Sequence, residues 1–183
     1  MAKALFLDRD GVINKDFGYV YEAEKFVFKT EVFPVIRAFQ AQGYKIIIVT
    51  NQSGIARGYY SERDFAKLSA WMCDTLLLHD IKIDDVLYCP HHPHEGNSVF
   101  TTACECRKPA PGMLLTAAVE HRLTLAESVM IGDKLSDVTA ACKAGLSKVY
   151  WLQELTDDKT DQLVQYDQAT QVIIVNHLSK ILD

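Results

Sequence analysis

The sequence has 183 residues, of which 49% are hydrophobic and 23% charged, and its formal net charge at neutral pH is −5. This composition is typical of a globular protein and excludes a fibrous or disordered chain, while the acidic balance argues against the broad basic face that sequence-independent binding to nucleic acid requires. The apolar stretch before Asp8 is too short for a signal-peptide core or a membrane span, so we expect a cytoplasmic protein that binds neither nucleic acid nor membrane.

Short apolar or β-branched runs alternate along the chain with segments of helical periodicity. The runs are typical of strands buried on both faces of a parallel sheet and lie at residues 4–7, 45–49, 86–88, 129–131, 148–151 and 171–175. The helical segments lie at 32–42, 62–79, 112–122 and 136–144, the last beginning with a serine cap at Ser136. The alternation predicts one α/β domain over residues 1–183, built on a doubly wound, mostly parallel, Rossmann-like sheet.

Two carboxylates follow the first predicted strand. Asp8 and Asp10 are two residues apart and can point to the same side of the chain. Like charges this close repel unless a cation lies between them, and Mg²⁺ prefers such oxygen ligands. With magnesium bound, Asp8 could attack phosphorus, and Asp10 could protonate the leaving group and later deprotonate water. The plainer interpretation is a solvated Asp-Gly turn.

Further polar groups follow the later strands, where ligands bind in an open α/β sheet. Residues 50–53 offer hydroxyl and amide groups as neutral donors to a phosphate, although a helix cap would have the same composition. Arg107 and Lys108 could neutralise two anionic groups, or form a solvated basic pair before a helix. Asp133 could complete a magnesium site, or interact with a helix dipole, and Asp137 could hold a water ligand or orient Lys134.

These motifs together resemble the haloacid dehalogenase superfamily of aspartyl-phosphate phosphatases. The resemblance covers residues 4–151 and rests on the sequences D-R-D-G-V-I-N, T-N-Q-S-G and G-D-K-L-S-D, with a lysine between the last two. It implies that Asp8 is the nucleophile and Asp10 the general acid and base. It also implies that the Asp8 side chain, the Asp10 carbonyl group and Asp133 hold magnesium, while Thr50 and Lys108 steady the phosphoryl group.

Three cysteines gather with histidines in the segment 89–106. A thiolate and imidazole set of this kind is typical of a closed, structural zinc site, which has no position open for water. We expect the ligands to be Cys89, His91, Cys104 and Cys106, with His92 or His94 as the less favoured imidazoles. The zinc-tied loop leads directly into Arg107 and would fix its position.

The spacing of the first two motifs leaves no room for a large cap domain, so loops must recognise the substrate. The resemblance implies a sugar bisphosphate as the small-molecule substrate, and because no amphipathic helix is left over we expect a monomer. It points to the following binding residues: Asp16, Phe17, Gly18, Tyr19, Thr50, Asn51, Gln52, Ser53, Arg107, Lys108 and Lys134. The alternatives are a histidinol phosphate substrate, a nucleic-acid 3′-end phosphatase, and a zinc-tied interaction module without catalysis.

Overall fold

The apolar runs form a seven-stranded sheet in the computed structural model, which describes residues 2–96, 98–153, 163–165 and 169–182. The strands, in the spatial order β3-β2-β1-β4-β5-β7-β6, are β1 (Lys3–Leu7), β2 (Tyr44–Asn51), β3 (Asp85–Cys89), β4 (Val129–Gly132), β5 (Lys148–Leu152), β6 (Leu163–Gln165) and β7 (Gln171–Val175). All neighbours pair in parallel except β6, which pairs antiparallel to β7. The predicted doubly wound α/β fold is confirmed, and β6 is an addition to it.

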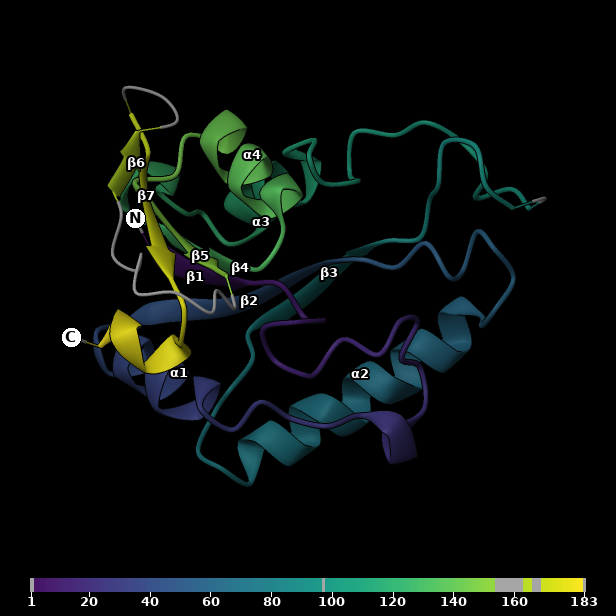
Figure 1. Cartoon of the computed structure of the whole chain (residues 1–183), viewed down its shortest axis with the longest axis horizontal. Coiled ribbons are helices and arrows are strands. Elements are labelled where there is room, and N and C mark those ends of the chain that lie inside the picture. Colours follow the sequence, from purple (N-terminus) through teal and green to yellow (C-terminus); the bar gives the residue numbers. More distant parts are fainter. Residues whose placement is uncertain (1, 97, 154–162, 166–168, 183) are drawn as a thin grey trace.

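Helices cover both faces of the sheet (Figure 1). Helices α1 (Val32–Ala41) and α2 (Glu62–Leu77) lie on one side, and α3 (Gly112–Glu120) and α4 (Leu135–Ala144) lie on the other. The short 3₁₀ helices are η1 (Ala23–Lys25), η2 (Leu125–Glu127) and η3 (Leu178–Ile181). Among the described residues, none of the helices combines the length and apolar character needed to span a bilayer.

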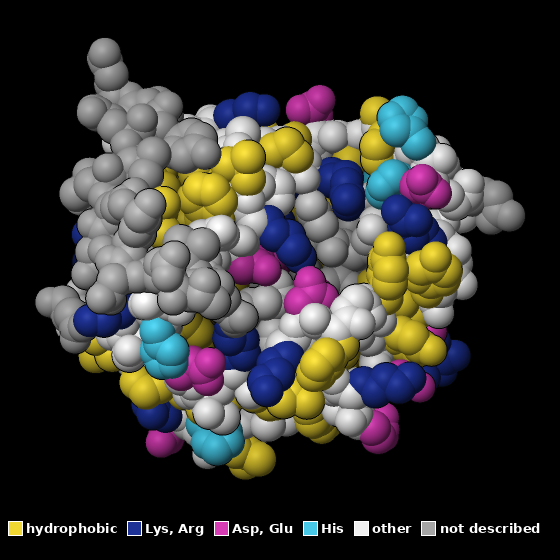
Figure 2. Space-filling view, in the orientation of Figure 1, with side chains coloured by type: hydrophobic (Ala, Val, Ile, Leu, Met, Phe, Trp, Pro, Cys, Tyr) yellow, Lys and Arg dark blue, Asp and Glu magenta, His cyan; other side chains and the backbone are white. Residues whose placement is uncertain are grey.

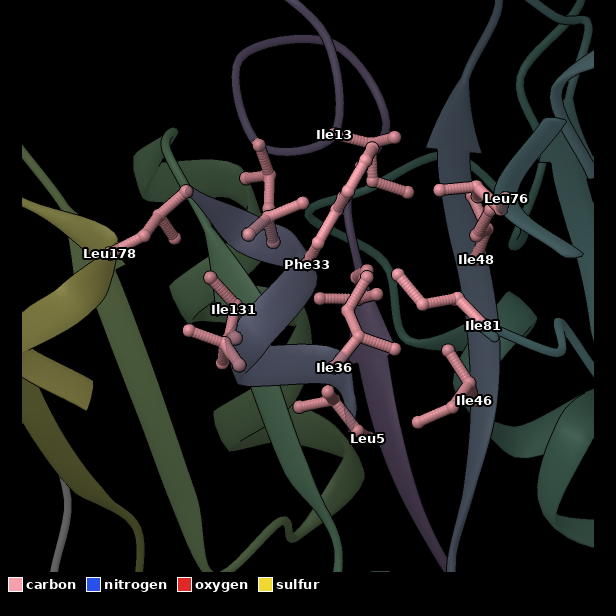
Figure 3. Close-up of a cluster of buried hydrophobic side chains, with 14 of the residues drawn as sticks. Leu5, Ile13, Phe33, Ile36, Ile46, Ile48, Leu76, Ile81, Ile131 and Leu178 are labelled. Carbon is pink, nitrogen blue, oxygen red and sulfur yellow. The ribbon is translucent and has the colours of Figure 1, made fainter. Parts of the chain in front are cut away.

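The continuous apolar runs are explained by alternation of side chains across the sheet. In β1, Leu5 and Leu7 join the core under α1 and α2, while Ala4 and Phe6 join the core under α3 and α4. The isoleucines of β2 divide in the same way. Figure 3 shows Leu5, Ile46, Ile48 and Ile131 from the strands meeting Phe33, Ile36 and Leu76 from the helices.

Four helix ends differ from the sequence prediction by one or two residues, the first of them at α1, which ends at Ala41 with Gln42 as its C-cap. Helix α4 begins at Leu135, so Ser136 lies inside it, because the Asp137 carboxylate accepts a hydrogen bond from the Lys134 amide and caps the first turn instead. Helices α2 and α3 end at Leu77 and Glu120 rather than two residues later. Left-handed residues follow each of them, Asp80 with φ 59° and Arg122 with φ 53°, and a right-handed helix cannot continue through them.

The strand register brings the polar motifs to one edge. Leu7 at the end of β1 pairs with Ile48 of β2 and with Ile131 of β4, so the residues that follow these strands leave the sheet side by side. The described chain between β1 and α1 contains one short helix, η1, and forms no inserted domain. The expected absence of a large cap there agrees with this arrangement.

Candidate active site and metal centre

A buried cluster of carboxylates lies beyond the ends of β1 and β4. Asp8, Asp133 and Asp137 each place a carboxylate oxygen within 4.8 Å of the others. The Lys108 ammonium group lies 3.0 Å from Asp8 Oδ1 and 2.6 Å from Asp137 Oδ1, and it donates to the Val49 carbonyl at 2.7 Å. Lys108 therefore pairs with two of the three carboxylates, and Asp133 has no such ion pair among the described residues.

Burial controls the proton affinities in this cluster. It raises the pKa of Asp8, although the neighbouring Lys108 opposes the shift. It also raises the pKa of Asp133 to about 7, with the charge of Asp8 adding to the effect. Burial alone would lower the pKa of Lys108, but Asp8 and Asp137 together raise it, so this lysine remains charged. A divalent cation would remove the repulsion that these shifts report.

The donor set around Asp133 fits magnesium. Asp133 Oδ1 is buried and has no hydrogen-bond partner among the described atoms, whereas the Asp133 carbonyl is held by Trp151 and Gln153. A buried carboxylate oxygen without a donor is a natural ligand for an oxygen-preferring cation. Gly11 is required beside it: φ is +95°, and a Cβ atom there would lie 2.2 Å from Asp133 Oδ2.

The polar residues at the end of β2, Thr50, Asn51 and Gln52, form a hydrogen-bonded wall of the site rather than a set of free donors. Thr50 is buried, and its hydroxyl group accepts a hydrogen bond from the Gln52 amide at 2.8 Å. Asn51 pairs with the backbone of Lys108 in both directions, at 2.9 and 3.0 Å, and so holds that residue at the site. Gln52 also donates to Asp10 at 3.1 Å and accepts from the Tyr60 hydroxyl group.

A cavity of about 570 Å³ opens beside this wall. It brings together most of the predicted substrate-binding residues, namely Asp16, Gly18, Tyr19, Asn51, Gln52, Ser53, Arg107, Lys108 and Lys134, with Asp10 and the unpredicted Tyr60, Pro109 and Ser136. In Figure 2, basic and acidic side chains gather around a hollow near the middle of the visible face. Such a cavity suits a ligand that is polar and multiply charged.

The segment 16–19 forms one side of the cavity mouth. Lys134 Nζ lies 3.0 Å from Asp16 Oδ2, and this lysine and the Gly18 amide lower the pKa of Asp16 although burial opposes the shift. The Tyr19 ring packs edge-on against the Tyr59 ring. Phe17 is 63% exposed and is not among the residues that line the cavity, so of the four predicted binding residues in this segment it is the one placed outside.

The predicted zinc ligands converge in a second cluster. The Cys89, Cys104 and Cys106 sulfur atoms lie 3.1–3.5 Å from one another, and His91 Nδ1 lies 3.3 Å from Cys106 Sγ and 3.6 Å from Cys89 Sγ. Tetrahedral zinc with bonds of about 2.3 Å would separate its donors by a little under about 4 Å. The chemistry and spacing of the set fit zinc.

Two neighbouring histidines are used differently. His92 Nδ1 accepts hydrogen bonds from the backbone amides of His94 and Glu95, at 3.3 and 2.8 Å, so it stabilises a turn of the loop. The ligand cluster of the described residues contains His91 and neither His92 nor His94.

Several contacts at the site have no signal in the sequence. The ion pair between Lys108 and Asp137 joins residues 29 positions apart and depends on how α3 and α4 pack. Arg9 has a fully buried side chain and contacts Asp10, yet an arginine between two aspartates looks like a solvated residue. The role of Tyr60 could not be predicted either, because its hydrogen bond to Gln52 depends on how the folded loop brings the two residues together.

Comparison with known proteins agrees with this geometry. A family model described as HAD-hydrolase-like matches residues 105–181. The D-glycero-beta-D-manno-heptose-1,7-bisphosphate 7-phosphatase of Haemophilus influenzae is 46% identical over 79% of this chain and 78% of its own length. The D-glycero-alpha-D-manno-heptose-1,7-bisphosphate 7-phosphatase of Burkholderia mallei is 50% identical over 79% of this chain and 76% of its own length.

A solved structure gives the same result over nearly the whole fold. The D,D-heptose 1,7-bisphosphate phosphatase from B. bronchiseptica, in complex with magnesium and phosphate, superimposes with a TM-score of 0.78 at 28% identity, covering 98% of this chain and 95% of its own. The identity and coverage of the relatives are high enough to assign the family. The chain belongs to the heptose-1,7-bisphosphate 7-phosphatase family of HAD-like phosphatases, which hydrolyse phosphate monoesters.

Proposed function

We propose that this protein removes the C7 phosphate of D-glycero-D-manno-heptose 1,7-bisphosphate and releases heptose 1-phosphate. The product would supply nucleotide-activated heptose for lipopolysaccharide cores. The observation that carries the proposal is the Asp8 carboxylate, buried beyond a strand end beside Lys108 and the partnerless oxygen of Asp133. The names of the relatives support the bisphosphate and give no support to histidinol phosphate. A zinc-tied interaction module without catalytic activity would not explain why three carboxylates are clustered beside Lys108.

In the proposed mechanism, the side chains perform two in-line displacements on phosphorus. A carboxylate oxygen of Asp8 forms a bond to phosphorus as the bond to the C7 oxygen breaks, and Asp10 gives its proton to that departing oxygen. A water molecule then attacks phosphorus, Asp10 takes a proton from it, and the bond to Asp8 breaks. Thr50 and Lys108 hold the phosphoryl oxygens through both steps.

The proposed ligands of magnesium are the Asp8 carboxylate, the Asp10 carbonyl group and Asp133. The ion would screen the repulsion between the attacking carboxylate and the phosphoryl group. The donors fit because Asp133 Oδ1 is buried without a partner and the cluster carries more negative than positive charge.

Magnesium affinity is expected to fall as the pH is lowered below about 7. The pKa of Asp133 is raised from 3.8 to about 7 by burial, so a proton competes with the ion in that range. The sign for folding follows from the same shift: without magnesium, the free energy of unfolding should decrease from about pH 4 to about pH 7 as ionised Asp133 becomes costly. Calorimetric titration with Mg²⁺ at pH 5.5 and 8 tests this, and equal affinities would contradict it.

Arg107 is proposed to bind the distal phosphate of the substrate. It lines the cavity and donates to the His91 carbonyl at 3.3 Å, while Lys108, which lies beside Asp8, serves the reacting phosphate. Arg107→Ala should lower kcat/KM for the bisphosphate by about 10²-fold and spare a small monophosphate, because a forked ion pair to phosphate is lost only with the former. Phosphate release on both substrates is the measurement, with the surface variant Arg37→Ala as control.

An equal fall in kcat/KM of Arg107→Ala on the two substrates would show that this arginine does not distinguish them. One curated relative is named for the beta anomer and another for the alpha anomer. Both anomers of the bisphosphate are therefore assayed side by side.

We further propose that Cys89, His91, Cys104 and Cys106 bind one structural zinc ion. The spacing of the donors and the closed set of four support this. Cys104→Ser should lose the zinc, lower the unfolding temperature and reduce kcat/KM by about tenfold or more, since Arg107 directly follows the cluster. Metal analysis and calorimetry are the measurements. Full zinc content in Cys104→Ser would contradict the assignment, and Cys73→Ser on α2 should retain the metal.

The enzyme is proposed to act as a monomer in the cytoplasm, on a small-molecule substrate, with residues 1–183 forming one domain. The net charge of −5 is in keeping with a partner other than nucleic acid.

A further inference from the structure

Arg9 is a buried cation whose purpose the mechanism above leaves open. Its side chain is 1% exposed and is the largest of the fully buried side chains. A guanidinium group does not lose its proton inside a protein, so its burial must be compensated by specific contacts. The described contacts of Arg9 are concentrated on one group, the carboxylate of Asp10.

The contact is a fork. Arg9 Nη2 lies 2.9 Å from Asp10 Oδ1 and 2.8 Å from Oδ2, and Arg9 Nε lies 3.1 Å from Oδ2. Paired donors of this kind fix the plane of a carboxylate as well as its distance. The same Nη2 also donates to the Val20 carbonyl at 2.8 Å. The guanidinium group therefore ties Asp10 to the end of the segment that forms the cavity mouth.

Two neutral donors complete the surroundings of this carboxylate. Asn14 Nδ2 donates to Asp10 Oδ1 at 3.0 Å, and Gln52 Nε2 donates to Oδ2 at 3.1 Å. Each of these amides reaches one oxygen, whereas the Arg9 fork reaches both. Asp10 itself lines the cavity, and its carboxylate is 15% exposed. Arg9 stays behind it and is not among the residues that line the cavity, so it acts on the carboxylate from the protein side.

We propose that Arg9 is a positioning residue that sets the orientation of the Asp10 carboxyl group toward the departing oxygen. The inference rests on the proposed role of Asp10 as general acid and base. General acid catalysis is effective only when the proton donor lies within hydrogen-bond reach of the leaving atom, and its share of the rate is typically about 10²- to 10⁴-fold. Loss of the fork would leave the acid present but misdirected.

The leaving group provides the test. An alkoxide needs the proton as it departs, whereas p-nitrophenolate is stable without it. Arg9→Met should lower kcat/KM for an alkyl phosphate by about 10²-fold and for p-nitrophenyl phosphate by less than about fivefold, with phenyl phosphate between. KM should change less than about twofold, because Arg9 does not line the cavity. Arg9→Lys keeps the charge and loses the fork. Its falls in kcat/KM should rank the three phosphates in the same order as those of Arg9→Met, and each fall should be smaller.

The controls separate this inference from the proposed function and from simple damage. Phe65 lies under the guanidinium group, with its ring centroid 5.8 Å away, so Phe65→Leu loosens the packing of Arg9 without removing the fork. Its losses should be small and equal on the three phosphates. Asp10→Asn should reproduce the leaving-group dependence in full.

The outcomes are distinguishable. Native activity in Asp10→Asn would remove the acid–base role on which the inference rests. A selective loss in Asp10→Asn, together with equal losses on all three phosphates in the Arg9 variants, would overturn the inference and leave the proposed function standing. If Arg9→Met does not fold, Arg9→Lys decides: a leaving-group dependence like that of the native protein would overturn the role of the fork.

Discussion

Asp8→Asn is expected to abolish turnover by at least about 10⁴-fold while leaving the fold at least as stable as that of the native protein. The loss follows from the proposed chemistry, because an amide cannot form the aspartyl phosphate. The stability follows from the burial of Asp8, which raises the pKa of this carboxyl group and makes its ionised form costly. Asparagine fills the same space without the charge, and Lys108 keeps its ion pair with Asp137.

Phosphate release and thermal unfolding in magnesium-free buffer measure the two effects. Asp8→Ala is assayed in parallel, since deamidation of an asparagine at position 8 would restore the native residue. The matched control is Asp85→Asn, which removes a partly buried carboxylate on β3 that pairs with His121. We expect near-native activity from that control. Residual turnover above about 1% in both Asp8 variants would contradict the assignment of the nucleophile.

Lys108→Met is expected to be the most destabilising of the single substitutions proposed for the site. The ammonium group is bonded to Asp8, Asp137 and the Val49 carbonyl, and its side chain is 2% exposed. Breaking a buried ion pair by removal of one partner typically costs about 3–5 kcal/mol, because the other charge remains buried. We expect a cost in that range and a loss of kcat of at least about 10²-fold, since the phosphoryl group also loses its cation.

The double variant Lys108→Met/Asp137→Asn distinguishes the two effects. Neutralising Asp137 removes one of the stranded carboxylates, so part of the free energy of unfolding should return while the activity should not. Urea denaturation and initial rates are the measurements, and Lys82→Met, at an exposed lysine, is the control for the substitution itself. A denaturation midpoint for Lys108→Met equal to the native one would contradict this account of the cluster.

The fold could be predicted from the sequence because the strands carry the signal of complete burial. The run at β2 is apolar on both faces, and such runs arise only where helices cover a sheet on both sides. The polar groups after β1, β2 and β4 could then be expected to meet, since parallel strands end at one edge. Strand β6 had no comparable signal: it is three residues long and lies at the edge of the sheet.

The contacts within the site could not be predicted in the same way. Asp137 was expected to hold a water ligand or orient Lys134. In the structure its Oδ1 atom pairs with the Lys108 ammonium group instead, and its Oδ2 atom accepts from the Lys134 backbone amide and caps α4. That pairing depends on how the loop before α3 packs against the first turn of α4, which a linear pattern does not contain. The burial of Arg9 is likewise a property of the closed loop around it.

Phosphate release by the purified protein in the presence of Mg²⁺, compared between heptose 1,7-bisphosphate and histidinol phosphate over one concentration range, tests the central claim most directly. The account predicts a kcat/KM at least about 10²-fold higher for the bisphosphate, because Arg107 lines the cavity and is proposed to bind its second phosphate. A preference for histidinol phosphate would contradict the proposed substrate but would remain consistent with the proposed chemistry of Asp8. No release from either substrate would contradict both.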